Sequence, residues 1–149
     1  MLEEGKEFQD FCVTQFPIVL GITISLFTSR KYQYNYGESL QCFEFKYDKL
    51  YRDTGNIWIE MQEKTNSENR EYKPSGILRN DNTQFWAIGD YRGVFIIPKK
   101  TLIVMSKKYT SIENNLKTSI GYLLPVKKAE DLFPYIGFSN EKTDKYEYT

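Results

Sequence analysis

The alternation of apolar and polar positions predicts a chain that opens with a helix and continues with several short strands. In residues 3–16, Phe8, Phe11 and Cys12 recur at helical spacing, and Pro17 is expected to stop this helix. Residues 18–28 are rich in β-branched side chains that alternate with polar ones, which is typical of a strand. A polar-aromatic segment at 32–37 is expected to be a loop or the lead-in to a strand. Further alternation predicts strands at 40–47, 57–61, 83–88, 94–97 and 121–126, and helices at 98–107 and 128–136.

This order of elements favours an α+β fold with α/β/α layers, in which helices flank a mixed central β-sheet. The strands at 40–47 and 57–61 are joined by a modest loop with a turn signal at residues 53–56, which suggests an antiparallel hairpin or meander. We expect residues 1–149 to form one domain, because the length suits a single core and no boundary is visible. A polar tail from about residue 139 is expected to fray.

Composition narrows the chemistry. The chain has 149 residues and no histidine, which excludes His-based zinc sites, Ser–His–Asp triads and Cys–His pairs. Carboxylate, lysine, tyrosine and metal chemistry remain. Cys12 and Cys42 lie outside any Cys-x-x-Cys motif, and we interpret them as thiols in a reducing compartment. The N-terminus lacks a basic signal region, and no apolar run reaches the ~20 residues of a membrane span. We therefore expect a cytoplasmic protein with no membrane association.

The formal net charge of zero conceals an asymmetry between the two halves of the chain. Residues 1–70 carry 8 basic and 11 acidic side chains, a balance of −3, whereas residues 71–149 carry 12 and 9, a balance of +3. Residues 99–128 contain seven lysines and a single acid, Glu113. Such a block suits contact with phosphates, and it is equally typical of solvated helices and loops.

The most informative segment surrounds Glu44 and Lys46. These residues are two apart on a predicted strand, so their side chains emerge on the same face. Glu38 precedes the strand, where a loop could return its carboxylate to Glu44. Two carboxylates at a strand end are suitable ligands for Mg²⁺ or Mn²⁺. A nearby lysine can position or deprotonate an attacking water, or neutralise negative charge on a phosphoryl group.

The acid–x5–Glu–x–Lys pattern of Glu38, Glu44 and Lys46 resembles the core of the PD-(D/E)XK, or restriction-endonuclease-like, nuclease superfamily. The wider similarity runs from about residue 7 to residue 97. It implies a mixed sheet whose two catalytic strands are 40–47 and its neighbour. It also implies a Mg²⁺ or Mn²⁺ ion held by Glu38, Glu44 and the Phe45 carbonyl, with Lys46 as the catalytic lysine. Glu7 would match the helix acid that some members use.

One departure from the family is clear, because the first acid is usually an Asp after Pro and here it is Glu38 after Gly37. Glu60 on the next strand is either a further acid near the site or part of a cross-strand ion pair with a lysine. Arg79, Asp81 and Gln84 are candidates for substrate contact, although a turn at residues 80–82 explains them structurally.

The sequence therefore predicts a Mg²⁺-dependent DNA endonuclease that hydrolyses phosphodiester bonds. A homodimer is compatible with an enzyme that cuts both strands. The alternative is a catalytically inactive nuclease-like fold that binds nucleic acid or protein, and an unrelated structural protein is a third interpretation. Three tyrosines in the polar-aromatic segment at 32–37 either stack on bases or pack at a sheet edge. They are Tyr32, Tyr34 and Tyr36.

Overall fold

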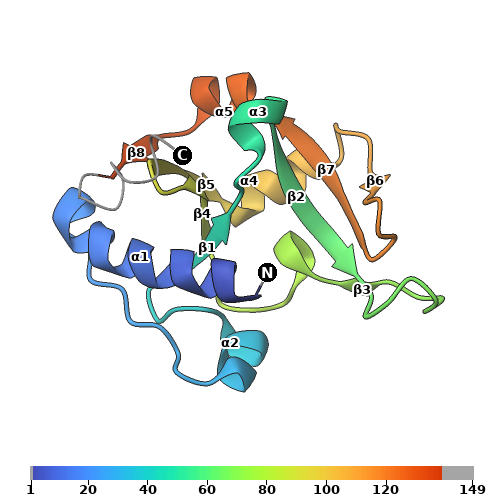
Figure 1. The fold of residues 1–149 in the computed structure, drawn as a ribbon, viewed down its shortest axis with the longest axis horizontal. Helices are drawn as coiled ribbons and strands as arrows, with labels where there is room; N and C mark the ends of the chain where they lie inside the picture. The colour runs from blue at the N-terminus through green and yellow to red at the C-terminus, as the bar shows by residue number, and fades with distance from the viewer. Residues whose placement is uncertain (1, 139–149) are drawn as a thin grey trace.

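The computed structural model describes residues 2–138, and the polar tail expected from residue 139 lies outside them. Helices and strands are mixed along the chain (Figure 1). In chain order they are α1 (Leu2–Leu20), α2 (Arg30–Tyr36), β1 (Phe43–Tyr47), α3 (Tyr51–Thr54), β2 (Asn56–Glu63), β3 (Lys73–Pro74), the 3-10 turn η1 (Gly76–Leu78), β4 (Phe85–Asp90), β5 (Gly93–Pro98), α4 (Lys99–Ser106), β6 (Ile112–Glu113), β7 (Ser119–Pro125), α5 (Val126–Leu132) and β8 (Tyr135–Gly137).

The strands form two four-stranded sheets, which confirms an α+β fold but not one central sheet. The first sheet has the order β1-β4-β5-β8 and the second the order β3-β2-β7-β6. The β1–β4 pair is parallel and the other pairs are antiparallel, so the first sheet is mixed. The expected hairpin between 40–47 and 57–61 is therefore wrong. Helix α3 separates the two strands, and Asp48 accepts a hydrogen bond from the Trp58 N–H as the chain passes into the other sheet.

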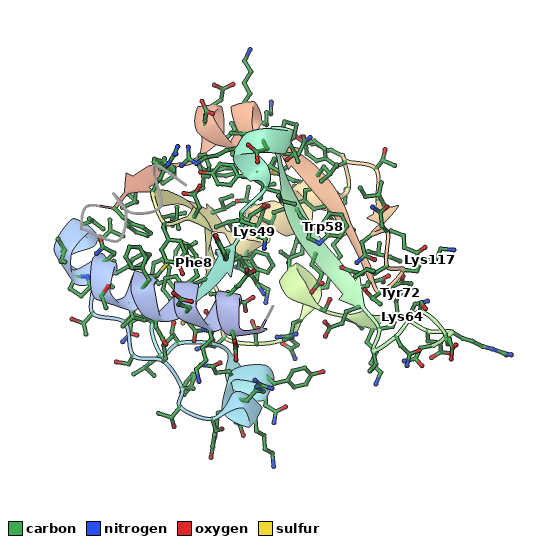
Figure 2. The ribbon with its side chains drawn as sticks, in the orientation of Figure 1. Phe8, Lys49, Trp58, Lys64, Tyr72 and Lys117 are labelled. Atoms are coloured by element: carbon green, nitrogen blue, oxygen red, sulfur yellow. The ribbon has the colours of Figure 1, made fainter. Side chains whose placement is uncertain are left out.

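Two apolar cores hold the layers together. Helix α1 covers one face of the first sheet, where Phe8 stacks on Tyr47 with ring centroids 5.0 Å apart (Figures 1 and 2). The opposite face packs against the second sheet, and α4 and α5 contribute to this second core. Trp86 on β4 and Tyr122 on β7 are its largest fully buried side chains. The order of layers is thus helix, sheet, sheet, with the first sheet in the middle.

The segments before β1 differ most from the expectation. Helix α1 continues through Pro17 to Leu20, and the strand expected at 18–28 is reduced to one bridge between Leu26 and Ser39. Pro17 is exposed, so the backbone hydrogen bond that proline cannot donate is lost on the solvent side of the helix. Residues 30–36 form helix α2 instead of a loop, because the Ser29 side chain accepts a hydrogen bond from the Tyr32 N–H and caps the first turn.

The C-terminal half follows the alternation closely. Strands β4, β5 and β7 and helix α4 lie where the pattern placed them. The helix expected at 128–136 instead ends at Leu132, because Pro134 cannot continue it and the next residues pair with β5 as strand β8. No helix within residues 2–138 combines the length and apolarity needed to cross a bilayer.

Candidate active site at the edge of strand β1

Strand β1 positions Glu44 and Lys46 on the same face of the first sheet. Alternate residues of this strand face opposite sides, and Phe45 points into the core beneath α1, where it is 4% exposed. Glu44 therefore faces the second sheet, next to Trp86, its partner in the β1–β4 register. Because side chains alternate along a strand, Glu44 and Lys46 both lie on the face of the first sheet that is turned toward the second sheet.

Glu44 and Lys46 form an ion pair with 3.0 Å between Glu44 Oε2 and Lys46 Nζ. The Glu44 side chain is 5% exposed, and its other oxygen accepts a hydrogen bond from the Thr83 hydroxyl at 3.4 Å. Lys46 Nζ also lies 5.2 Å from the centroid of the Trp86 ring. The negative charge of Glu44 raises the pKa of Lys46 above its usual value, and this effect exceeds the opposing effect of burial. Lys46 is consequently a cation at neutral pH.

Glu38 returns to the same strand from the preceding loop. Its Oε1 accepts a hydrogen bond of 2.9 Å from the Phe45 N–H, and the Gln9 side chain on α1 also hydrogen-bonds to this carboxyl. Burial, together with the negative charge of Glu44, raises the pKa of Glu38 to about 7. Lys46 opposes this shift but does not cancel it. The structure therefore brings Glu38, Glu44 and Lys46 into one electrostatically coupled group.

The Phe45 carbonyl shares the open edge of the sheet with Glu38. Among the described residues, β1 pairs with β4 alone. The carbonyl of Cys42 and the N–H of Asp48 both form hydrogen bonds with β4 or the residues just before it. In a strand, the N–H and the carbonyl of one residue point to the same side, and those of the next residue point to the opposite side. Because the Phe45 N–H bonds to Glu38, the Phe45 carbonyl also points away from β4. The third ligand that the family resemblance implied is thus directed to the edge that carries Glu38.

Glu60 adds a third acid from the second sheet. Its two carboxylate oxygens accept hydrogen bonds from the hydroxyls of Ser75, at 3.1 Å, and Ser119, at 2.8 Å. The charge of Glu60 contributes to the raised pKa of Lys46. The pairing of β2 with β7 is irregular between Glu60 and Gln62, and such bulges re-aim side chains. The negative charge of Glu60, on the second sheet, therefore acts on Lys46 of the first sheet.

The donor set suits a hard divalent cation. Within residues 2–138, no group of three or more His, Cys, Asp or Glu side chains is arranged to hold a metal ion. Mg²⁺ is commonly bound through one or two carboxylates, with water and substrate phosphate as the remaining ligands. Glu38 and Glu44 supply two carboxylates, and the Phe45 carbonyl points to the same edge of β1, while Lys46 Nζ lies 3.0 Å from Glu44 Oε2. These residues fit such an ion.

Gly37 precedes Glu38 and has a backbone conformation that favours glycine. Its φ is +125°, and a β-carbon at this position would overlap the side-chain amide of Asn82. Proline is fixed near φ −65° and cannot adopt this conformation. The end of α2 therefore requires glycine at this position, and this turn directs Glu38 toward β1.

Several residues of the site were not apparent from the sequence. Gln9 binds Glu38, whereas Glu7, the helix acid suggested by the resemblance, lies on the exposed side of α1. The signal for Gln9 was a polar residue on the same helical stripe as Cys12 and Phe16. No local pattern indicates Thr83, which approaches Glu44 only through the parallel pairing of β1 and β4.

The lysine-rich block does not form one surface. Lys99 is buried and pairs with Asp81 at 2.8 Å, so both residues have structural roles. The other six lysines of the block are exposed, on α4 and just after it, on α5 and near the β6–β7 turn. Figure 2 shows Lys117 at the right-hand side of the view, at the end of the second sheet away from α1. The block is therefore distributed over several elements.

Comparisons with known proteins leave the family open. No protein-family model, curated protein or solved structure matches this chain.

Proposed function

We propose that this protein is a metal-dependent endodeoxyribonuclease that hydrolyses phosphodiester bonds with a PD-(D/E)XK-type site. The observation that carries the proposal is the convergence of Glu38, Glu44 and Lys46 at the edge of β1, where the pKa of Glu38 is raised to about 7. Two carboxylates that repel each other beside one ammonium group leave negative charge that a divalent cation would offset. Such an arrangement is costly for a purely structural role and useful for a metal site.

Glu38, Glu44 and the Phe45 carbonyl would hold Mg²⁺ or Mn²⁺. When bound, the ion would supply an activated water and stabilise negative charge on the phosphoryl group. Lys46 is protonated in the observed arrangement, which supports a role in neutralising charge that develops on the phosphate oxygens. Trp86 and Glu44 fix the position of its ammonium group. The restriction-endonuclease-like identity of the fold is part of the same proposal.

The proposal extends to the partner and the location. DNA is the expected substrate, and the exposed lysines on α4 and α5 can contact its phosphates. A homodimer would allow cleavage of both strands of a duplex. Cys12 and Cys42 are free cysteines, which agrees with a reducing cytoplasmic location.

Cleavage of supercoiled plasmid and of branched oligonucleotides, with Mg²⁺ or Mn²⁺ and with EDTA, tests the proposal. We expect metal-dependent cleavage by the wild type and a loss of about 100-fold or more in Glu44→Gln and Lys46→Ala. Lys49→Ala is the matched control, because Lys49 forms an exposed ion pair with Glu4 at 3.1 Å outside the site. Equal cleavage by all four proteins would contradict the proposal and indicate a contaminating nuclease.

A second candidate is a catalytically inactive nuclease-like module that binds nucleic acid or protein. The Lys46–Glu44 ion pair favours it, because Lys46 already offsets the charge of one proposed metal ligand. Thermal melting with Mn²⁺ separates the two candidates. An occupied site stabilises the folded state by about 3 kcal/mol at a metal concentration 100-fold above Kd, whereas an inactive module gives no shift.

A further inference from the structure

Helix α2 presents an exposed aromatic surface that nothing in the site uses. Tyr32, Tyr34 and Tyr36 are 55%, 57% and 57% exposed, and no residue of this helix is buried. They lie on a helix and not at the edge of a sheet, so sheet packing does not account for them. Figure 1 shows α2 projecting on the far side of α1 from the sheets. We call the pair Tyr32 and Tyr36 the tyrosine surface; Tyr34, two residues from each, lies on another side of the helix beside Arg79.

The rings of the tyrosine surface are already ordered. Tyr32 and Tyr36 are one helical turn apart and stack on each other, with centroids 5.3 Å apart and planes at 27°. The Arg79 guanidinium lies 4.8 Å from the centroid of Tyr34. Both tyrosines of the stacked pair remain more than half exposed, so a planar group can still reach them. Preordered rings lose little conformational entropy when a ligand stacks on them.

The charges beside these rings favour an anionic ligand. Helix α2 contains Arg30 and Lys31, both exposed, and no acidic residue. Arg79 lies on Tyr34 and is paired with Glu63 at 3.6 Å, so Arg30 and Lys31 supply the positive charge of this helix. Planar aromatic side chains interspersed with cations are the combination that binds single-stranded nucleic acid, since each base offers a π-face and each linkage a phosphate.

Helix α2 lies next to the candidate active site along the chain, and backbone hydrogen bonds hold both sides of this junction. The Tyr36 carbonyl accepts a hydrogen bond from the Asn82 N–H at 2.8 Å, and the Glu38 carbonyl accepts one from the Phe27 N–H at 3.1 Å. Gly37 alone separates the end of α2 from Glu38. A strand that stacks on the tyrosine surface would therefore lie near the segment that carries Glu38.

We infer that the tyrosine surface binds unpaired bases of single-stranded DNA and holds that segment beside Glu38. Base stacking on Tyr32 and Tyr36 supplies the sequence-tolerant part of this binding, and Arg30 and Lys31 contact the backbone phosphates. The substrate class is thus DNA with an unpaired segment, such as a junction, a flap or a single strand. Its delivery to a hydrolytic centre rests on the proposed function, whereas the binding itself does not.

Fluorescence polarisation with a labelled oligothymidine of roughly 12 nucleotides, compared with a duplex of equal length, tests the inference. The measurement uses the full chain carrying Glu44→Gln, in EDTA, so that no cleavage occurs. We expect the single strand to bind at least about 5-fold more tightly than the duplex, and Tyr32→Ala and Tyr36→Ala each to weaken that binding about 10-fold. Tyr32→Phe and Tyr36→Phe retain the ring and should bind like the parent.

Tyr135→Ala is the matched control, because Tyr135 is 42% exposed but lies on β8, away from α2. It should leave binding unchanged, and circular dichroism should show that each alanine variant is folded. Equal affinity for single strand and duplex, or equal affinity of parent and alanine variants, would overturn the inference. Dimers that dissociate in Tyr32→Ala would also overturn it, since a second copy would then occupy the surface. The two proposals can fail separately. Metal-dependent cleavage by the wild type without a preference for single strands would overturn only this inference. Tight single-strand binding without any cleavage would overturn only the proposed function.

Discussion

The raised pKa of Glu38 should make the stability of the protein depend on pH in a direction opposite to that of an ordinary salt-bridged acid. The groups that face Glu38 are Glu44 and Lys46 from β1 and Gln9 and Cys12 from α1. Burial, with a smaller contribution from Glu38, raises the pKa of the Cys12 thiol, so Cys12 stays neutral across the range considered. Glu38 is therefore the group of this set whose protonation changes near pH 7.

The sign and size follow from linkage between protonation and folding. The folded state binds the Glu38 proton with a pKa of about 7, against 4.5 for an unperturbed Glu, so the folded state keeps a proton that the unfolded state has lost. This stabilisation is complete below about pH 4.5 and is lost as the pH rises through about 7. Between pH 5 and pH 8, its loss amounts to about 2 to 3 kcal/mol.

Urea unfolding of the wild type and of Glu38→Gln at several pH values between 5 and 8 measures this effect. Glutamine keeps an Oε1 that can accept the Phe45 hydrogen bond but does not titrate, so the stability of the variant relative to the wild type should increase by about 2 to 3 kcal/mol across the range. Glu4→Gln is the control, because Glu4 is exposed and its difference from the wild type should stay within about 0.5 kcal/mol.

Parallel stability curves for the wild type and Glu38→Gln would refute this account of the site. A second readout is the response to Mn²⁺, which competes with the proton for Glu38 and should stabilise the wild type more at pH 8 than at pH 5. A Mn²⁺ response of equal size at both pH values would show that the ion binds elsewhere.

Three further substitutions test the framework around the site. Gly37→Ala combines a positive φ with overlap on Asn82, and we expect a loss of about 2 kcal/mol or more in urea unfolding together with a weaker Mn²⁺ response; wild-type values for both would contradict the role given to this turn. Asp81→Asn leaves the buried Lys99 ammonium without its counter-charge and should cost about 3 kcal/mol or more, measured by the same assay. A loss below 1 kcal/mol would mean that solvent reaches this pair. Tyr122→Phe removes a buried 2.7 Å hydrogen bond to a carbonyl of α4 and should lower the free energy of unfolding by about 1 kcal/mol, whereas an unchanged value would mean that the carbonyl finds another donor.

The local hydrophobic pattern predicted the secondary structure correctly where the surrounding packing favours the same element. The alternation at Phe85–Asp90 and Gly93–Pro98 predicted two strands, and they form an antiparallel hairpin in the centre of the first sheet. Pro98 was expected in the first turn of the helix at 98–107; it ends β5 and caps α4, which begins at the next residue. In both cases, the elements involved are adjacent along the chain: β4 pairs with β5, and α4 follows β5 directly.

Local pattern failed where a distant contact or a cap decided the conformation. Residues 18–20 have β-branched and apolar side chains, yet they extend α1, whose apolar side packs on the first sheet. Residues 30–36 look like a loop, yet Ser29 caps them as a helix. The strand that follows β1 along the chain is not its partner in the sheet. Strand β1 pairs in parallel with β4, which lies about forty residues further along the chain, and no local pattern indicates this pairing.

The amino-acid sequence alone determined that Glu44 and Lys46 share one face of a strand, because side chains alternate with a period of two along any extended chain. It also limited the chemistry to groups other than histidine. Tertiary structure decided the rest: the glycine turn that returns Glu38 to Phe45, the approach of Gln9 from α1, and the position of Glu60 on another sheet. These contacts join segments distant along the chain, so they depend on how the layers pack and leave no local periodic signal.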